Sequence, residues 1–191
     1  LEKYSEHHLA KPIIEEAKVK KLEFLEIKDF EAVAGKGVKG KLTVDSQEVL
    51  GAIGNRALMT DLGISLKEAE KDIVELESQG KTVVILATEN KVKGLLAVAD
   101  TLKDESKEAV RALKKEGLQV WMITGDNERV AKAIGEQVGI ENIMAEVLPS
   151  QKAEKVEELQ KTGKLVAMGG DGINDAPALA RADLGIAMGE G

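Results

Sequence analysis

The second half of the chain alternates short apolar runs with longer stretches in which apolar residues recur every three or four positions. The apolar runs predict buried strands at Leu95–Val98, Leu118–Ile123, around Ile143, at Leu165–Met168 and at Leu184–Ala187. The periodic stretches predict helices at Lys103–Glu116, Asn127–Val138, Pro149–Gly163 and Ala176–Ala182. Gly139 is placed to cap the second of these helices. Strand–helix alternation of this kind predicts a Rossmann-like α/β domain, with a parallel sheet covered by helices on both faces.

The first half of the chain has a different pattern, typical of an α+β domain with an antiparallel sheet. A helix is predicted from about Glu6 to Ala17, and two more after Asn55, the second over Leu66–Gln79. Short strands separated by Gly and Asp are predicted at Leu22–Ile27, Glu31–Ala34, Leu42–Val44 and Val49–Ile53, followed by a hairpin of Thr82–Ala87 and Val92–Val98 that turns at Glu89–Asn90. The change of pattern predicts two domains, residues 1–94 and 95–191.

Composition excludes several classes of protein. The net charge of −7 gives no support to a nucleic-acid-binding surface, which is usually cationic. The 191 residues contain no Cys, so there is neither a disulfide framework nor a thiolate metal site. No apolar run reaches the length of about 18 residues that a transmembrane helix needs. The chain begins Leu1-Glu2-Lys3 without Met or a signal peptide, as we expect of a piece of a longer protein.

A glycine-rich stretch at residues 35–41 matches two nucleotide-binding patterns, GxGxxG and most of GxxxxGK. Both patterns must open a helix whose N-terminus faces phosphate, but residues 41–44 read as a strand. The second pattern also needs Ser or Thr next, and position 42 is Leu. Two interpretations stay open: a glycine turn between strands, or a backbone that approaches a nucleotide closely.

Polar residues follow three strands or apolar runs of the second half. Thr124-Gly125-Asp126 follows one, Lys152 comes after the run that ends at Pro149, and the segment from Gly170 to Asp175 follows the last. The carboxyl ends of parallel strands converge at one edge, where ligands bind. A hydroxyl, an ammonium group and two carboxylates together predict a phosphoryl site. Thr124 would bind phosphate oxygens, Lys152 would neutralise their charge, and Asp171 would hold Mg²⁺ with support from Asp175.

A simpler interpretation of the same segments is structural. Asp126 and Asp175 each precede a predicted helix, where a carboxylate commonly caps the first turn, and the neighbouring glycines commonly form turns. We favour the phosphoryl site because three separate segments would have to imitate one constellation by chance.

Thr124-Gly125-Asp126 and the string from Gly170 to Pro177, GDGINDAP, closely resemble the phosphorylation domain of the P-type ATPases, within the haloacid-dehalogenase-like superfamily. Ser5-Glu6-His7, Gly35-Lys36-Gly37 and Gly54-Asn55 resemble the nucleotide-binding domain of the heavy-metal-transporting class. The resemblance covers nearly the whole chain. Two positions depart from the family pattern: His8 stands where Pro is usual, and Gly169 stands where Val is usual.

The resemblance implies ATP and Mg²⁺ as cofactors and assigns roles to particular residues. The residues that would hold the adenosine part of ATP are Glu6, His7, Gly35, Gly37 and Asn55. Those that would serve phosphoryl transfer are Thr124, Gly125, Asp126, Lys152, Asp171, Asn174 and Asp175. The family's phosphorylated Asp lies in the string DKTGT, which this sequence lacks. We therefore expect a fragment that binds nucleotide but cannot form the acyl phosphate alone.

The parent protein implied by the resemblance transports a metal ion, with monovalent copper as first choice and zinc or cadmium next. The fragment would lie on the cytoplasmic side of the cell membrane, with the membrane and actuator domains of the same chain as partners. The transported ion would not bind to it. Two alternatives remain: a soluble phosphatase of the same superfamily with Asp100 as nucleophile, and a non-catalytic ATP-binding module.

Overall fold

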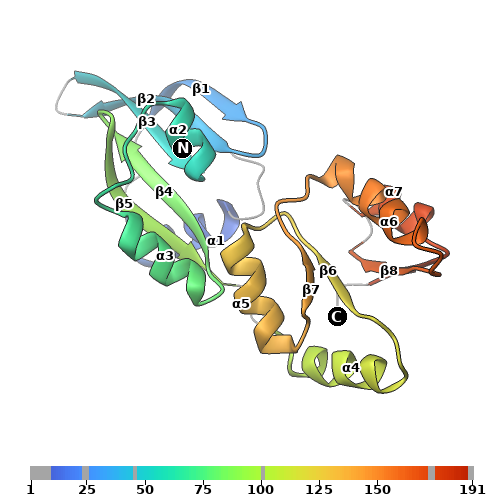
Figure 1. Cartoon of the computed structure of the whole chain (residues 1–191). Coiled ribbons are helices and arrows are strands. Elements are labelled where there is room, and N and C mark those ends of the chain that lie inside the picture. The colour runs from blue at the N-terminus through green and yellow to red at the C-terminus, as the bar shows by residue number, and fades with distance from the viewer. Residues whose placement is uncertain (1–9, 23–25, 45–46, 100–101, 172–174, 189–191) are drawn as a thin grey trace. The chain divides into compact units, whose positions relative to one another are not determined.

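The computed structural model describes residues 10–22, 26–44, 47–99, 102–171 and 175–188 (Figure 1). The chain divides into two compact units, Leu1–Thr101 and Leu102–Gly191, called unit 1 and unit 2 below. The described helices include none that combines the length and the apolarity needed to cross a bilayer.

Unit 1 contains a five-stranded antiparallel sheet in which every strand pairs with its neighbour in the sequence. The strands are β1 (Ile27–Val33), β2 (Gly37–Val44), β3 (Gln47–Gly54), β4 (Thr82–Thr88) and β5 (Lys91–Val98). Strand β5 pairs with β4 as far as Val98, so the division between the units comes after Thr101 and not at residue 94. Residues 95–98 therefore belong to the antiparallel sheet and do not begin the parallel one.

The beginning of the sheet differs from the prediction. The runs Leu22–Ile27 and Glu31–Ala34 were expected as two strands. Residues 23–25 of the first run lie outside the described part of the chain, but its last residue, Ile27, belongs to the same strand as Glu31, β1. Its register against β2 shifts between Lys28 and Glu31, where Asp29 has φ of +50°. This irregularity interrupts the alternation of apolar and polar residues, which is why the sequence pattern predicts a break.

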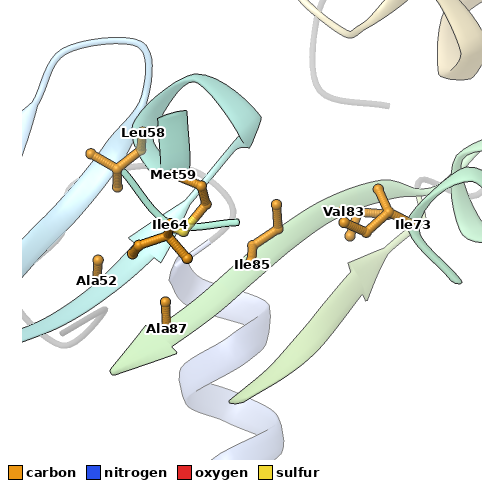
Figure 2. Close-up of a cluster of buried hydrophobic side chains, with 8 residues drawn as sticks. All are labelled: Ala52, Leu58, Met59, Ile64, Ile73, Val83, Ile85 and Ala87. Carbon is orange, nitrogen blue, oxygen red and sulfur yellow. The ribbon is translucent and has the colours of Figure 1, made fainter. Parts of the chain in front are cut away.

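The core of unit 1 lies between the sheet and two short helices. The helices of this unit are α1 (Ala10–Val19), α2 (Arg56–Asp61) and α3 (Glu70–Ser78). Figure 2 shows eight buried apolar side chains, seven from α2, α3 and strands β3 and β4 and one, Ile64, from the loop between the helices. Leu58 and Met59 of α2, Ile73 of α3 and Ile85 of β4 are at most 1% exposed. Burying side chains of this size stabilises the fold by about 1.5–3 kcal/mol each.

The β4–β5 hairpin forms where the sequence predicts it. Glu89 and Asn90 have φ of +52° and +59°, the backbone of a two-residue turn whose twist matches the flanking strands. Asn tolerates positive φ well, and this local signal is why the turn could be predicted.

Unit 2 alternates helices and short strands. Its elements are α4 (Asp104–Lys115), β6 (Trp121–Ile123), α5 (Glu128–Val138), β7 (Asn142–Met144), the 3-10 turn η2 (Pro149–Gln151), α6 (Lys152–Gln160), β8 (Ala167–Gly170), α7 (Ala176–Arg181) and β9 (Leu184–Ala187). The strands are parallel, as predicted, but in the described residues they form two separate pairs, β6 with β7 and β8 with β9. Leu165 precedes β8 and is 89% exposed, so that strand begins later than its apolar run suggests.

Helix α5 has the termini that the sequence predicts. The side chain of Asn127 accepts hydrogen bonds from the backbone N–H groups of Arg129 and Val130 and so caps the first turn. Gly139 closes the last turn in the left-handed conformation, with φ of +81°. Val130, Ala131 and other residues of the inward face are buried.

Candidate functional site

The loop after β6 folds around the side chain of Thr124. Its hydroxyl donates a hydrogen bond of 2.8 Å to Oδ2 of Asp126 and accepts one of 3.1 Å from the Asp126 backbone N–H. These two bonds close a compact turn over Gly125. The hydroxyl and the carboxylate that the sequence singled out are therefore neighbours at the carboxyl end of a parallel strand, where ligands bind in such sheets.

The same loop is fastened to the segment that leads to Lys152. The N–H of Val147 donates to the carbonyl of Thr124 at 3.0 Å, and the N–H of Glu146 donates to the carbonyl of Asp126 at 2.8 Å. Glu146 adopts φ of +56°, an uncommon conformation for a residue with a Cβ. The residues between β7 and η2 are thus held against the Thr124 loop by backbone hydrogen bonds.

Lys152, the first residue of α6, forms an ion pair with Asp175 at the start of α7. Its Nζ lies 2.6 Å from Oδ1 of Asp175, and the side chains are only 18% and 12% exposed. The two residues are 23 positions apart in the sequence. The sequence analysis expected both near one edge of the sheet, but it did not expect them to pair with each other. Because both charges are largely withdrawn from water, their attraction is stronger than that of a surface pair.

Gly170, the last residue of β8, lies against the carboxylate of this pair. A Cβ placed on Gly170 would lie 2.5 Å from Oδ2 of Asp175 and 2.9 Å from its Cγ, whereas a Cβ on Gly169 would meet nothing within 4 Å. The carboxylate of Asp175 therefore packs on the bare backbone of Gly170. Asp171, the next residue, is exposed to solvent.

The capping interpretation of the two aspartates does not fit this geometry. Asn127, not Asp126, caps α5, while Asp126 interacts with Thr124. Asp175 occupies the cap position of α7, but its side chain makes no capping hydrogen bond and turns to Lys152 instead. Asp126 thus interacts with a hydroxyl of its own loop, and Asp175 interacts with the first residue of α6.

The glycine-rich stretch of unit 1 is a turn followed by a strand. Residues 37–44 form β2, so neither nucleotide-binding pattern opens a helix, as the sequence context predicted. Its three lysines are each paired with a carboxylate, Lys36 with Asp61, Lys39 with Glu31 and Lys41 with Asp29. A phosphate-binding loop would direct its lysine at the ligand.

Asn55 joins the two glycine segments that the resemblance pointed to. Its side-chain N–H donates to the carbonyl of Gly35 at 2.9 Å, and its Oδ1 accepts from the N–H of Leu58 at 3.1 Å. The Asn55 backbone N–H also donates to the carbonyl of Lys36 at 2.8 Å. Gly35, Gly37 and Asn55 are therefore brought together at one end of the sheet.

Sequence reasoning missed an ion cluster next to Asn55. Arg56 bonds to Glu77 through Nε at 3.2 Å and Nη2 at 3.1 Å, and to Glu70 through Nη1 at 2.6 Å. The side chain of Glu77 is only 3% exposed. Its hydrogen bonds raise the pKa of the Arg56 guanidinium above its ordinary value. A Glu that interrupts the apolar face of a predicted helix is the one signal that could have suggested a buried partner.

Several predicted residues lie outside the described part of the chain. These are Glu6, His7 and Asn174, together with the alternative nucleophile Asp100. Within the described residues no three His, Asp or Glu side chains gather into a metal-binding group. Asp171 nevertheless suits Mg²⁺, because this ion commonly binds one or two carboxylates and takes its other ligands from water and phosphate. One oxygen of Asp175 is occupied by Lys152.

A family profile described as haloacid dehalogenase-like hydrolase matches residues 1–183. The chain belongs to this family. This haloacid dehalogenase-like chain is 47% identical over all of its 191 residues to the copper-exporting P-type ATPase of Staphylococcus aureus, of which it covers 23%. It thus spans about a quarter of the length of the curated relatives it matches.

Solved structures agree with the sequence match. The catalytic domain of the CPx-ATPase CopB-B aligns with 98% of the haloacid dehalogenase-like chain, at a TM-score of 0.63 and 27% identity, over 64% of that domain. A zinc-transporting PIB-type ATPase in the E2P state aligns with all of it, at a TM-score of 0.55 and 35% identity, over 30% of that protein. The likeness extends across both units.

Proposed function

We propose that this chain is the nucleotide-binding and phosphorylation region of a heavy-metal-transporting P-type ATPase. Unit 1 binds ATP and unit 2 carries the groups for phosphoryl transfer. The observation that carries the proposal is the ion pair of Lys152 and Asp175 on Gly170, beside the exposed Asp171. An ammonium group paired with one carboxylate, with a second carboxylate next along the chain from Gly170, supports a site for phosphate and Mg²⁺, and the sequence match to such ATPases covers these segments.

Each group of unit 2 has a role that suits its surroundings. The hydroxyl of Thr124, held by Asp126, binds a phosphate oxygen. Lys152 lies in a largely desolvated position, where its charge acts more strongly on a phosphate than it would in open solvent. Asp171 is the residue that would hold Mg²⁺, and Asp175 keeps Lys152 in place. The ion, when bound, neutralises charge on the transferred phosphate.

Unit 1 supplies the nucleotide site in this proposal. Gly35, Gly37 and Asn55 form its described part, and Glu6 and His7 hold the adenine end. Conformational changes upon nucleotide binding are described for the catalytic domain of CopB-B, which is 26% identical to this chain. Titration with ATP of the unmodified chain and of its His7→Ala and Glu6→Ala variants tests this role. Unchanged affinity in both variants would refute the adenine assignment.

The phosphorylated Asp belongs to a part of the parent protein outside these residues. Incubation of the chain with labelled ATP and Mg²⁺, followed by acid precipitation, should therefore leave no label. An acid-stable, hydroxylamine-labile label would contradict this. In the full-length protein the same assay should give a phosphoenzyme that Lys152→Ala abolishes. Lys155→Ala is the matched control, because Lys155 lies on the same helix and forms an ion pair with its helical neighbour Glu158.

The parent exports monovalent copper across the cell membrane in this proposal, with the present region on the cytoplasmic side and the membrane and actuator domains as its partners. The copper-exporting relatives are 47% identical, against 35% for a zinc-transporting structure. Phosphoenzyme formation by the full-length protein should depend on Cu⁺. Stimulation by Zn²⁺ alone would assign the other ion.

A further inference from the structure

The turn that joins β1 to β2 is held by a hydrogen bond from a side chain outside the turn, that of Asn55. Asn55 lies at the start of α2 and reaches the carbonyl of Gly35 with its amide N–H at 2.9 Å. With its other end, Oδ1, it caps α2 by accepting from the N–H of Leu58 at 3.1 Å. A single amide group therefore ties the glycine turn to the helix start. A carboxylate could make only the second of these bonds, because it has no N–H to donate.

The turn and the end of β3 pack so closely that neither Gly37 nor Gly54 has room for a Cβ. A Cβ on Gly54 would overlap the carbonyl oxygen of Lys36 and would lie 2.6 Å from Cδ2 of Leu58. A Cβ on Gly37 would lie 2.5 Å from Cα of Gly54. Gly37 also has φ of +141°, which side-chain-bearing residues rarely adopt. The position of the turn is thus set by direct backbone contact, with Asn55 as its lateral fastening.

Arg56 fixes the other side of the same helix start. Its guanidinium holds the buried carboxylate of Glu77 through two hydrogen bonds and that of Glu70 through a third. Both carboxylates belong to α3, which packs beside β4. The two adjacent residues thus bind different parts of unit 1: Asn55 binds the glycine turn, and Arg56 binds α3. Bidentate pairs of this kind constrain orientation as well as distance.

We propose that Asn55 is a positioning residue of the nucleotide site and that Arg56, held by Glu77, anchors it. The amide of Asn55 keeps the Gly35–Gly37 turn in its binding shape before any nucleotide arrives. This inference rests on the proposal that unit 1 binds ATP. A site that is already formed loses less conformational entropy on binding, so the fastening increases affinity without contact between Asn55 and the ligand.

The Asn55→Asp variant separates the two bonds of this residue. Asp still caps α2, since it is an equally good capping residue, but it presents an oxygen to the Gly35 carbonyl instead of an N–H donor. Two measurements on the whole chain follow: amide NMR of Gly35, Lys36 and Gly37 without nucleotide, and calorimetric titration with Mg-ATP. We expect all three amide resonances to move in the free protein, and ATP affinity to fall at least about 10-fold, since one lost hydrogen bond corresponds to about this factor. The Leu58 amide should keep its position.

Ile73→Val is the matched control for stability, because it removes one methyl group from a fully buried side chain and costs about 1 kcal/mol. It should change neither the turn resonances nor ATP affinity. Arg56→Lys should shift the turn amides less than Arg56→Ala, because one charged hydrogen bond to Glu77 is retained.

The proposal is overturned if Asn55→Asp weakens ATP binding while the turn amides of the free protein stay in place, since Asn55 would then act by touching the nucleotide. It is also overturned if the turn moves and affinity does not. If the unmodified chain binds no ATP, the proposed function of unit 1 fails, while the free-state resonances still report whether Asn55 holds the turn.

Discussion

Substitution of Gly170 by Ala tests the packing at the end of β8. The added methyl group would lie 2.5 Å from Oδ2 of Asp175, closer than a Cβ contact allows, so the carboxylate must move. The movement lengthens or breaks the 2.6 Å bond to Lys152. Breaking a fully buried pair costs about 3–5 kcal/mol, and this pair retains some exposure, so we expect a loss of about 2 kcal/mol in the free energy of unfolding of unit 2.

Urea unfolding followed by fluorescence measures this loss. The chain has one Trp, Trp121 in β6, so its emission reports unit 2 and not unit 1. With a denaturant slope of about 1 kcal/mol/M for a unit of this size, the midpoint should fall by about 2 M. Gly169→Ala, one residue earlier in the same strand, meets open space and should leave the midpoint unchanged or slightly higher.

Equal midpoints for Gly170→Ala and Gly169→Ala would show that Asp175 has room to yield, and would refute the reasoning. A second comparison isolates the ion pair. In a Lys152→Met background the bond is already absent, so Gly170→Ala should cost clearly less than it does in the unmodified chain. The same cost in both backgrounds would mean that the methyl group acts on the backbone and not through Lys152.

Three further changes have expected outcomes. Hydrogen bonds from Gln160 and from the N–H of Val166, with the nearby charge of Arg181, lower the pKa of Asp183. The contribution of Asp183 to stability is therefore present above the ordinary pKa of about 3.9 and is lost as pH falls through the lowered value. In Asp183→Asn the urea midpoint followed by Trp121 fluorescence should fall less steeply as the pH is lowered, and an unchanged pH dependence would count against this reasoning. Ile85→Ala removes a fully buried side chain from the core of unit 1 and should lower the free energy of unfolding of that unit by about 2–5 kcal/mol. The loss is measured by circular dichroism. Leu50 is 40% exposed, so Leu50→Ala should cost less than about 1 kcal/mol in the same assay. Asn127→Ala removes the cap of α5 and should cost about 1 kcal/mol by Trp121 fluorescence, and no loss would contradict the capping geometry.

Features that depend on neighbouring residues could be predicted from the sequence. The Glu89–Asn90 turn and the two ends of α5 at Asn127 and Gly139 are encoded within a few positions, and the structure confirms them. The sequence predicted that Lys152 and the segment of Asp175 would lie near one edge of a parallel sheet, but it did not predict that the two side chains form an ion pair.

Features that depend on distant partners could not be predicted. Nothing near Arg56 indicates that, among 34 acidic residues, Glu70 and Glu77 are the ones it binds. The shift in register at Asp29 depends on pairing with β2, so the apolar pattern alone did not join Ile27 to the run that begins at Glu31. The same holds for the parallel strands of unit 2, whose direction follows from the alternation of elements but whose pairing into separate sets does not.

The order of the strands in unit 1 bears on how the protein is made. Each strand pairs with the one synthesised just before it, and the chain passes from unit 1 to unit 2 after residue 101. The first sheet can therefore close while later residues are still inside the ribosome, without waiting for a distant partner. We expect arrested nascent chains that expose unit 1 alone to resist protease, because this unit would already be folded before unit 2 emerges.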